Sequence, residues 1–465
     1  MVRLLAWEVL RSGSVTPLRE VDVAADEVGL DPRDRGLLRA IVGAEVRHRG
    51  TLRALVNAFA RGRPKAGLRA HLHLGFAQLL YLDRLPPRAV LSEQVDATRH
   101  TLGASKTTYV NAVLRALLRA RKPGHCGDPR RDVVGAPWHL EQPVFHDREE
   151  HPALWAEDAL SIPGHLFKRW HKRHGLERAV ALGTTFLDPP DLSLRAIGGD
   201  RAALVAELAD ARPDQELVEG AHPDVLLVRG DLAGLFDLPA FAEGRATVQG
   251  ESALRAAGLV QARPDEELLD LCAAPGGKTA VLAGAGARVT AVDVSEAKLA
   301  RLTDTAARLG LAERVEPLLA PPLARDAGAP ADPDLPGHAP GPADYVALGE
   351  RSFDGVLVDA PCSNTGVLGA RPGARWRFGP SNQKALVTLQ AALLREGAAR
   401  VRPGGRLVWS TCSIEPEENR QLLRPFLEEH PGWVLEEEHE ALPGPTEAGG
   451  PVDGGYAARL RRPAS

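Results

Sequence analysis

Apolar residues recur at helical spacing throughout the first 120 residues of the chain. Leucine, valine and isoleucine lie three and four residues apart over residues 4–10, 37–46 and 72–80, a spacing that places them on one face of a helix. Asp31 followed by Pro32 is typical of a helix N-cap and first turn. The pattern predicts about five or six helices packed in one α domain.

From residue 268 the pattern changes to short apolar runs that alternate with longer amphipathic stretches. Buried strands are predicted at residues 268–271, 289–292, 356–358 and 407–409. The amphipathic stretches at residues 296–309 and 383–401 predict helices between them. Strands separated by helices indicate a parallel, doubly wound α/β sheet, the class I or Rossmann-like architecture.

Several segments fit neither pattern and suggest where one domain ends and the next begins. Residues 122–152 are rich in Pro, Gly, Asp and His, whereas residues 320–345 and 442–455 are dense in Pro and Gly and predict mobile loops. A length of 465 residues suits about three domains. We expect an all-α domain over residues 1–125, a linker over 126–152, a small middle α/β unit over 153–245 and an α/β sheet domain over 246–465, with an insertion at 320–345.

A basic segment lies near the start of the expected middle unit. Residues 166–174 are LFKRWHKRH, in which basic side chains surround one tryptophan. One interpretation is a solvated amphipathic helix with Phe167 and Trp170 packed inward. The other is a helix that contacts nucleic-acid phosphates on the way to an active site. The spacing alone leaves both open.

Composition excludes several classes of protein. With 44% hydrophobic and 25% charged residues, the chain is neither disordered nor collagen-like. Residues 1–10 lack the long apolar core of a signal peptide, and the sequence has no apolar run of about 18 residues, so we expect a cytoplasmic monomer that does not bind membranes. The four cysteines, Cys126, Cys272, Cys362 and Cys412, form no paired CxxC spacing. We therefore expect free thiols, and no metal site.

Charge is distributed unevenly along the chain. Residues 1–131 carry 23 Lys and Arg against 12 Asp and Glu, a net charge of +11, whereas residues 132–465 carry a net charge of −15. This asymmetry points to a polyanion as the partner of the basic part.

The strongest motif joins a predicted strand to a helix through a turn of small residues. It comprises Cys272, Ala273, Ala274, Pro275, Gly276, Gly277, Lys278 and Thr279. Neither the phosphate-binding loop nor the dinucleotide fingerprint matches, because their glycine spacing is absent. Asp293, about twenty residues downstream at the end of the next strand, is placed to accept hydrogen bonds from ribose hydroxyls. Its alternative role is to cap the following helix, which Ser295 can also do.

Two further strands each deliver a cysteine to the same edge of the sheet. Asp359 and Cys362 follow the strand at residues 356–358, and Cys412 follows the strand at residues 407–409. A lone cysteine is usually a small buried hydrophobe. Two thiols just past strand ends, one of them beside a carboxylate, favour chemistry instead.

Together these motifs resemble the Sun/Fmu family of S-adenosylmethionine-dependent RNA cytosine-C5 methyltransferases. The resemblance rests on residues 272–279 (CAAPGGKT), 359–362 (DAPC), 410–413 (STCS), 248–253 (VQGESA) and 453–460 (DGGYAARL). Residues 32–37 (PRDRGL), 80–86 (LYLDRLP) and 110–115 (VNAVLR) are similar to the NusB-like RNA-binding domain of the small-subunit ribosomal RNA branch. The resemblance implies a NusB-like N-terminal domain, S-adenosylmethionine bound by residues 272–278, Asp293 and Asp359, and 16S ribosomal RNA as substrate.

The resemblance also implies a role for each residue of the site. Cytosine C5 is a poor nucleophile until another nucleophile adds to C6, and a thiolate is suited to that addition. Cys412 is the implied nucleophile, and Cys362 assists loss of the C5 proton and release of the product. Asp359 holds the target base, and Lys278 supports the cluster by orienting Asp359 or lowering the pKa of a thiol. The opposite assignment stays open, because DNA cytosine methyltransferases use the cysteine of a Pro-Cys pair and Pro361-Cys362 fits that pattern.

The chain departs from the family's pattern in a few places. The segment at residues 315–321 (VEPLLAP) has no carboxylate at the position where the family places one near the adenine, and Asp326 is only a candidate to replace it. The proline-rich insertion lies beside that position. Gly250 stands where Asp is common, and residues 194–197 (LRAI) lack a common Asn.

Two alternative functions follow from the same features. Within the enzyme class, the target is a cytosine of transfer RNA or of another RNA. Outside it, the chain is a non-catalytic NusB-like RNA-binding factor whose sheet domain has lost activity. The complete set of Cys362, Cys412, Asp359 and the cofactor loop argues against the second alternative.

Overall fold

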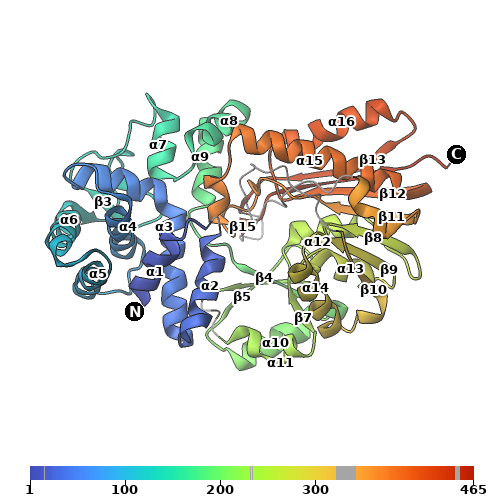
Figure 1. The fold of residues 1–465 in the computed structure, drawn as a ribbon, viewed down its shortest axis with the longest axis horizontal. Coiled ribbons are helices and arrows are strands. Elements are labelled where there is room, and N and C mark those ends of the chain that lie inside the picture. Colours follow the sequence, from blue (N-terminus) through green and yellow to red (C-terminus); the bar gives the residue numbers. More distant parts are fainter. Residues whose placement is uncertain (15, 231, 233, 321–341, 446–450, 465) are drawn as a thin grey trace. The chain divides into compact units, whose positions relative to one another are not determined.

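A computed structural model describes residues 1–465 except 15, 231, 233, 321–341, 446–450 and 465. The chain forms two compact units (Figure 1). The helical unit comprises Met1–Pro189 and Leu368–Gly379, and the sheet unit comprises Pro190–Val367 and Pro380–Ser465. Among the described residues, no helix is long and apolar enough to span a membrane.

The helical unit begins with six α-helices, as the apolar spacing predicts. They are α1 (Val2–Arg11), α2 (Pro17–Val28), α3 (Pro32–Phe59), α4 (Ala66–Tyr81), α5 (Pro87–Leu102) and α6 (Thr107–Ala120), the last preceded by the 3₁₀ helix η1 (Ala104–Lys106). Apolar faces of α1 to α4 meet in a buried core that includes Leu5, Val21 and Leu38. The Asp31 carboxylate accepts the backbone N–H of Asp34 at 2.8 Å, which confirms the predicted start of α3.

The helical unit also includes segments that the sequence predicts as the linker and as part of the middle unit. A three-stranded antiparallel sheet, in the order β1-β3-β2, consists of β1 (Arg121–Pro123), β2 (Asp132–Val133) and β3 (Trp138–Leu140). Three helices follow: α7 (Pro152–Ala159), α8 (Gly164–His174) and α9 (Leu176–Thr185). The expected linker therefore contains two strands, and the expected middle unit is divided at residue 189.

Helix α8 contains the basic segment. Leu166, Phe167 and Trp170 are buried, whereas Lys168 and Lys172 are exposed. The amphipathic interpretation is correct for the packing, because the apolar residues lie three and four positions apart and share one face.

The sheet unit starts with a small antiparallel sheet in the order β5-β6-β4-β7. Its strands are β4 (Leu192–Ala196), β5 (Glu216–Glu219), β6 (Val225–Arg229) and β7 (Ala246–Val248). Its helices are η2 (Ile197–Gly199), α10 (Arg201–Ala211), η3 (Leu235–Asp237) and α11 (Pro239–Ala242). Leu194, Leu208 and Val228 belong to its buried core.

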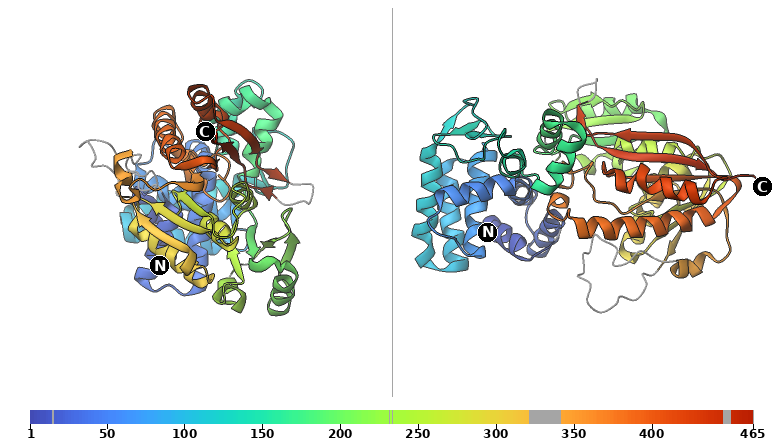
Figure 2. Two further views of the ribbon diagram at one scale, coloured as in Figure 1. Left: turned by 90° about the vertical axis from the view of Figure 1, so that its right-hand side faces the viewer. Right: turned by 90° about the horizontal axis from the view of Figure 1, so that it is seen from above.

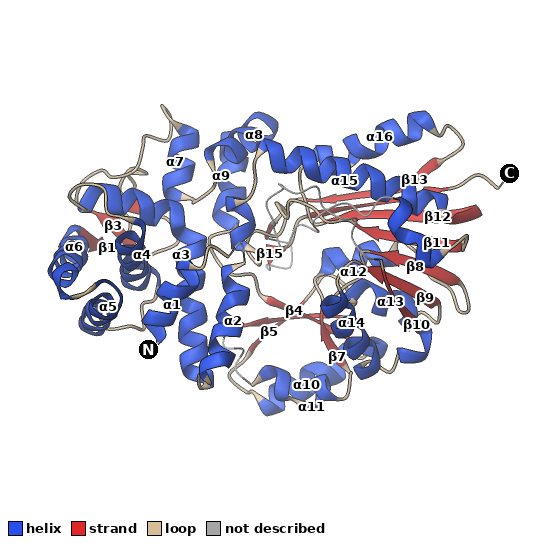
Figure 3. Ribbon diagram, in the orientation of Figure 1, coloured by secondary structure: helices blue, strands red, loops and turns tan. Residues whose placement is uncertain are grey.

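A seven-stranded sheet follows, in the order β10-β9-β8-β11-β12-β16-β13 (Figure 3). The first five strands in that order are mutually parallel, as predicted, and β16 runs antiparallel to both β12 and β13. The strands are β8 (Glu267–Leu271), β9 (Arg288–Asp293), β10 (Val315–Leu319), β11 (Phe353–Asp359), β12 (Val401–Thr411), β13 (Val434–Ala441) and β16 (Gly455–Arg461). The doubly wound α/β class is thereby confirmed.

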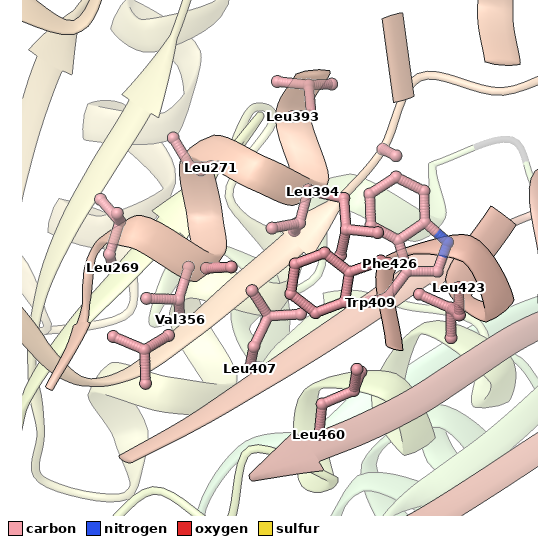
Figure 4. Close-up of a cluster of buried hydrophobic side chains, with 14 of the residues drawn as sticks. Leu269, Leu271, Val356, Leu393, Leu394, Leu407, Trp409, Leu423, Phe426 and Leu460 are labelled. Carbon is pink, nitrogen blue, oxygen red and sulfur yellow. The ribbon is translucent and has the colours of Figure 1, made fainter. Parts of the chain in front are cut away.

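Helices cover both faces of this sheet (Figures 1 and 2). The connecting helices are α12 (Glu251–Gly258), α13 (Gly277–Gly284), α14 (Glu296–Arg308), η4 (Ala312–Arg314), η5 (Pro342–Leu348), η6 (Pro372–Trp376), α15 (Pro380–Ala399), η7 (Pro416–Glu418) and α16 (Arg420–Glu429). Figure 4 shows Leu393 and Phe426, from α15 and α16, packed with Leu407 and Trp409 of β12. The opposite face is covered by α12 and α13.

Each of the two expected loops includes residues that the structure does not describe. Residues 321–341 of the expected insertion between β10 and β11, with Asp326 among them, are not described. In the second, β14 (Gly444–Pro445) pairs with β15 (Pro451–Val452) as a short antiparallel sheet, and residues 446–450 are not described.

Candidate active site

The turn of residues 272–277 joins β8 to α13 at the carboxyl edge of the sheet. Gly276 has φ +100°, and a Cβ there would lie 2.9 Å from Cγ of Leu302. Only glycine fits this position without displacing α14. The first N–H groups of α13 have no acceptor within the helix, which suits them to a negatively polarised ligand group.

Asp293 ends β9 beside this turn. Its carboxylate accepts the backbone N–H groups of Ala274 at 3.3 Å and Ser295 at 3.0 Å. Ser295 itself caps α14 through the N–H of Lys298. Burial raises the pKa of Asp293. Asp293 therefore ties the turn to the next strand instead of capping the helix.

Sequence reasoning missed Asp270, a carboxylate inside β8. Its side chain is fully buried, and one oxygen accepts the Thr279 hydroxyl at 2.7 Å. The other oxygen, Oδ1, has no hydrogen-bond partner among the residues that the structure describes. Burial raises the pKa of Asp270 to about 7. An acidic residue inside the otherwise apolar predicted strand at residues 268–271 was the available signal.

Lys278 and Asp359 form a partly buried ion pair at the same edge. Lys278 Nζ donates to Asp359 Oδ2 at 2.6 Å, and the Ser410 hydroxyl donates to Asp359 Oδ1 at 3.1 Å. Burial alone would lower the pKa of Lys278, but the charge and hydrogen bond of Asp359, together with the charges of Cys412 and Asp270, outweigh burial and the pKa is raised. Lys278 thus stays charged. Asp359, about a third exposed, is oriented from two sides.

Cys362 and Cys412 lie against one another, with their Sγ atoms 3.1 Å apart. Asn364, which sequence reasoning also missed, contacts both residues. Its side-chain N–H donates to the Cys362 carbonyl at 2.8 Å, and its side-chain oxygen accepts the Cys412 thiol at 3.1 Å. Cys362 is buried and Cys412 is half-buried.

The two thiols have unequal surroundings. The pKa of Cys362 is raised by its hydrogen bond to Cys412, then by burial and by the charges of Cys412 and Glu418. On the other side, a negative charge on Cys412 is among the influences that raise the pKa of Lys278. Negative groups therefore act on Cys362, whereas Cys412 lies within the influence of the Lys278 ammonium.

Cys272 is not part of this pair. It packs against the apolar core beneath the sheet edge, and burial raises its pKa well above the ordinary value. All four cysteines are free thiols. Cys126 is exposed in the helical unit.

Two departures from the family pattern can be located. Arg195 donates to Gln249 Oε1 at 2.8 Å, and Gln249 Nε2 donates to the Gly277 carbonyl at 3.1 Å. Gly250 is the N-cap of α12. Near the third strand, the backbone N–H of Ala320 donates to the Asp293 carbonyl, and the position of Asp326 lies beyond the described residues.

The donor and acceptor set fits a nucleoside carrying an amino-acid group. Asp293 suits ribose hydroxyls, the unpaired oxygen of Asp270 suits an ammonium group, and the N–H groups at the start of α13 suit a carboxylate. Among the described residues, no cluster of His, Cys, Asp and Glu is arranged to hold a metal ion.

Solved structures show the same fold. The crystal structure of PH0851 matches with a TM-score of 0.72 and 23% identity, covering 99% of this chain and 98% of that one. NSun6 from Pyrococcus horikoshii, solved with SFG, matches with a TM-score of 0.51 and 19% identity over 65% of this chain and 98% of that one.

Family models and curated relatives agree with one another. The NusB family model matches residues 4–119, and the model of 16S rRNA methyltransferase RsmB/F matches residues 257–320 and 338–448. A probable ribosomal RNA small subunit methyltransferase B of Bacillus subtilis (strain 168) is 31% identical over 371 residues, 78% of this chain and 72% of that protein. Ribosomal RNA small subunit methyltransferase B of Salmonella paratyphi B is 30% identical over 418 residues, 86% of this chain and 84% of that protein. The chain belongs to the RsmB/F family of 16S rRNA methyltransferases, and its cofactor is S-adenosylmethionine.

Proposed function

We propose that this protein methylates carbon 5 of a cytosine in 16S ribosomal RNA, through a covalent bond between Cys412 and C6 of the base. The observation that carries the proposal is the pair of thiols 3.1 Å apart, beside the Lys278–Asp359 ion pair, at the carboxyl edge of the sheet. The names of the relatives supply the 16S target.

The cofactor supplies a methyl group on a positively charged sulfur. Residues 272–277 and Asp293 would hold it, the turn through backbone groups and Asp293 through the ribose hydroxyls. Asp270 would accept from the ammonium group, because its Oδ1 is buried and has no other partner in the described part of the chain.

The chemistry begins with the thiolate of Cys412. Its sulfur forms a bond to C6, the C5–C6 double bond opens, and C5 becomes nucleophilic enough to take the methyl group. C5 then loses its proton, the double bond forms again, and the C6–sulfur bond breaks to return the thiolate. The cytosine must leave any stack to present its face to the sulfur, so a flipped or single-stranded base is required.

Asp359 is suited to hold the N3 and N4 edge of the base. Its oxygens are fixed by Lys278 and Ser410, and each can accept a further hydrogen bond. A fixed carboxylate favours a proton at N3 as electron density moves into the ring during addition.

Cys362 is suited to the later proton step. In the resting pair, the hydrogen bond and charge of Cys412 keep the pKa of Cys362 high. Once Cys412 is a neutral thioether, both influences are removed, so the pKa of Cys362 falls. Cys362 then releases its own proton to solvent, and its thiolate accepts the proton from C5.

Adduct trapping tests these roles and the opposite assignment for Pro361–Cys362. With S-adenosylmethionine and 16S RNA transcripts, Cys362→Ala is expected to accumulate a protein–RNA adduct that survives denaturing electrophoresis, because the release step is impaired. Cys412→Ala should form none. Cys126→Ala, a change in an exposed thiol of the helical unit, should behave as the parent. An adduct with Cys412→Ala but not with Cys362→Ala would reverse the assignment.

The target RNA needs a separate measurement. Bisulfite sequencing of ribosomal RNA from a deletion strain should reveal one cytosine in 16S RNA that loses protection. If a cytosine of transfer RNA loses its protection from bisulfite instead, transfer RNA is the substrate. Absence of S-adenosylmethionine binding at millimolar concentration, measured by calorimetry, would favour a non-catalytic RNA-binding factor.

A further inference from the structure

We propose that Glu418 is a positioning residue, which holds the two cysteine-bearing loops together and keeps the two thiols chemically different. It is the last residue of η7, six positions after Cys412, and its side chain is fully buried. The proposal rests on the proposed function, since it concerns the pair of thiols used there.

The carboxylate of Glu418 binds both loops at once. One oxygen, Oε2, accepts the backbone N–H of Ser363 at 2.8 Å. The other, Oε1, accepts the Ser363 hydroxyl and the Ser413 hydroxyl, the latter at 2.9 Å. Ser363 directly follows Cys362, and Ser413 directly follows Cys412. One side chain thus sets the separation of the two residues adjoining the thiols.

A helix fixes the same carboxylate from a third direction. Gln390 of α15 donates to Glu418 Oε2 at 3.0 Å and, through the same nitrogen, to the Pro361 carbonyl at 2.8 Å. Thr365 adds a cross-link, because its hydroxyl lies 3.1 Å from the Ser413 hydroxyl and accepts the backbone N–H of Ile414. The loops are therefore held as one hydrogen-bonded network.

Burying a carboxylate without a cation is costly unless its lone pairs are occupied. Burial raises the pKa of Glu418, and the donors from Ser363, Gln390 and Ser413 act in the opposite direction. Packing alone does not explain this free-energy cost, since Gln would fill the same volume without a charge.

The position of the charge gives it a chemical consequence. Glu418 is among the groups that raise the pKa of Cys362, whereas the ammonium of Lys278 is on the side of Cys412. A negative group on one side and a positive group on the other separate the acidities of two otherwise identical thiols. Glu418 thereby favours Cys412 as the thiolate.

Glu418→Gln tests the proposal in the full-length protein. Gln keeps the size of the side chain but removes its charge and one acceptor facing the Ser363 loop. Limiting iodoacetamide at neutral pH, followed by peptide mass spectrometry, gives the alkylation rates of Cys412 and Cys362. We expect a ratio strongly in favour of Cys412 in the parent and at least a tenfold lower ratio in Glu418→Gln. An unchanged ratio overturns the proposal.

Two further variants keep the test decisive. Ser413→Ala removes one link but leaves the carboxylate and its other donors, so it reports on positioning even if Glu418→Gln does not fold; the ratio should fall by a smaller factor. Glu417→Gln is the matched control, because it makes the same change one position away, at a residue that accepts from Gln383 of α15. A Glu417→Gln ratio that falls as far as that of Glu418→Gln overturns the proposal.

Activity separates this proposal from the proposed function. Glu418→Gln should lower kcat for RNA methylation by about ten- to a hundredfold, the size of effect of small misplacement of reacting groups, while KM for S-adenosylmethionine stays within about twofold. If Cys362→Ala forms no RNA adduct but the alkylation ratio in the parent still depends on Glu418, the proposed function fails and the positioning role stands. A parallel loss of cofactor binding in Glu418→Gln would assign Glu418 to general stability and overturn the positioning role.

Discussion

Asp270 and Asp359 have chemically identical side chains, but a difference in burial gives their two carboxyl groups different properties. Asp359 is partly exposed and paired with Lys278, so it is stabilised as a charged acceptor. Asp270 is fully buried with one hydroxyl donor, and burial raises its pKa to about 7. A charged carboxylate in that position destabilises the fold at neutral pH unless a cationic group of the ligand pairs with it. Its cost in stability is therefore linked to its proposed role in binding.

Asp270→Asn should therefore stabilise the protein in a pH-dependent way. The carboxyl titrates near 3.8 when unfolded and near 7 when folded, so between these values the folded chain retains a proton that the unfolded chain has lost. The free energy of unfolding of the parent then decreases as the pH rises from about 4 to about 7. Above pH 7 this carboxyl causes no further change with pH. The variant lacks this decrease, so its advantage in urea unfolding should grow between pH 5 and pH 8, by roughly a few kcal/mol.

Asp304→Asn, on the exposed surface of α14, is the control and should show no such trend. In calorimetry, Asp270→Asn should also weaken binding of S-adenosylmethionine. An equal stability difference at pH 5 and pH 8 would contradict the environment assigned to Asp270.

Among the elements, the turn between β8 and α13 carries the tightest geometric demand. It must reverse the chain within a few residues and leave the helix N-terminus open at the sheet edge. Gly276 meets this demand with a left-handed φ and close contact with Leu302 of α14. Turn geometry, helix packing and ligand access thus depend on one position.

Gly276→Ala should destabilise the turn and weaken cofactor binding together. The added Cβ would lie 2.9 Å from Leu302 Cγ and would adopt a φ of +100°, at a cost of about 1–3 kcal/mol. Thermal unfolding and calorimetry with S-adenosylmethionine measure the two effects. Gly258→Ala in α12, where the Cβ would meet nothing within 4 Å, should leave both unchanged. Equal behaviour of the two variants would refute the role of Gly276.

At the scale of the whole molecule, the two units are not continuous in sequence. Leu368–Gly379, which starts six residues after Cys362, belongs to the helical unit. Its Arg375 is fully buried and donates to backbone carbonyls of Phe186 at 2.9 Å, Leu368 at 3.2 Å and Arg47 at 3.3 Å. Burial lowers the pKa of Arg375 to about 9. Carbonyl dipoles, in place of a carboxylate, solvate this charge.

Arg375→Ala should destabilise the helical unit severely. It leaves several buried carbonyls without donors and opens a cavity, which together cost more than about 3 kcal/mol. Guanidinium unfolding followed by tryptophan fluorescence measures the change, because Trp376 packs against α3 and donates to the Val46 carbonyl. Arg371→Ala, at an exposed position of the same segment, should change stability by less than about 0.5 kcal/mol. A small effect of Arg375→Ala would show that the segment is held by other contacts.

RNA affinity is also a property of the whole molecule. Because the helical unit extends to residue 189, deleting residues 1–131 would cut through it, so point variants are the cleaner test. If α8 contacts phosphates, Lys168→Ala with Lys172→Ala should reduce the salt dependence of binding to single-stranded RNA by about 0.7 per lost contact. Fluorescence anisotropy across salt concentrations measures this slope. Arg263→Ala with Arg288→Ala is the control, because Arg263 precedes β8 and Arg288 begins β9, at the sheet edge opposite the thiols. Identical slopes for the parent and the α8 variant would show that Lys168 and Lys172 face solvent and do not contact phosphates.

The sequence by itself determined which elements form and which residues reach the reactive edge of the sheet. A period of 3.6 or 2 reports on a few neighbouring residues, so the helices of the first 120 residues and the strands around Leu269 and Trp409 could be predicted locally. Because parallel strands end at one edge, Asp293, Asp359 and Cys412 were expected there without knowledge of register.

Only the tertiary structure decided the pairings within that edge and the membership of the two units. Cys362 and Cys412 are 50 residues apart, Lys278 and Asp359 are 81 apart, and Glu418 and Ser363 are 55 apart. A local pattern shows that a face is apolar or that a side chain is polar, but not which distant group meets it. That choice depends on strand order, register and loop path. For this reason the roles of Asn364 and Glu418 and the place of residues 368–379 emerged from the fold alone.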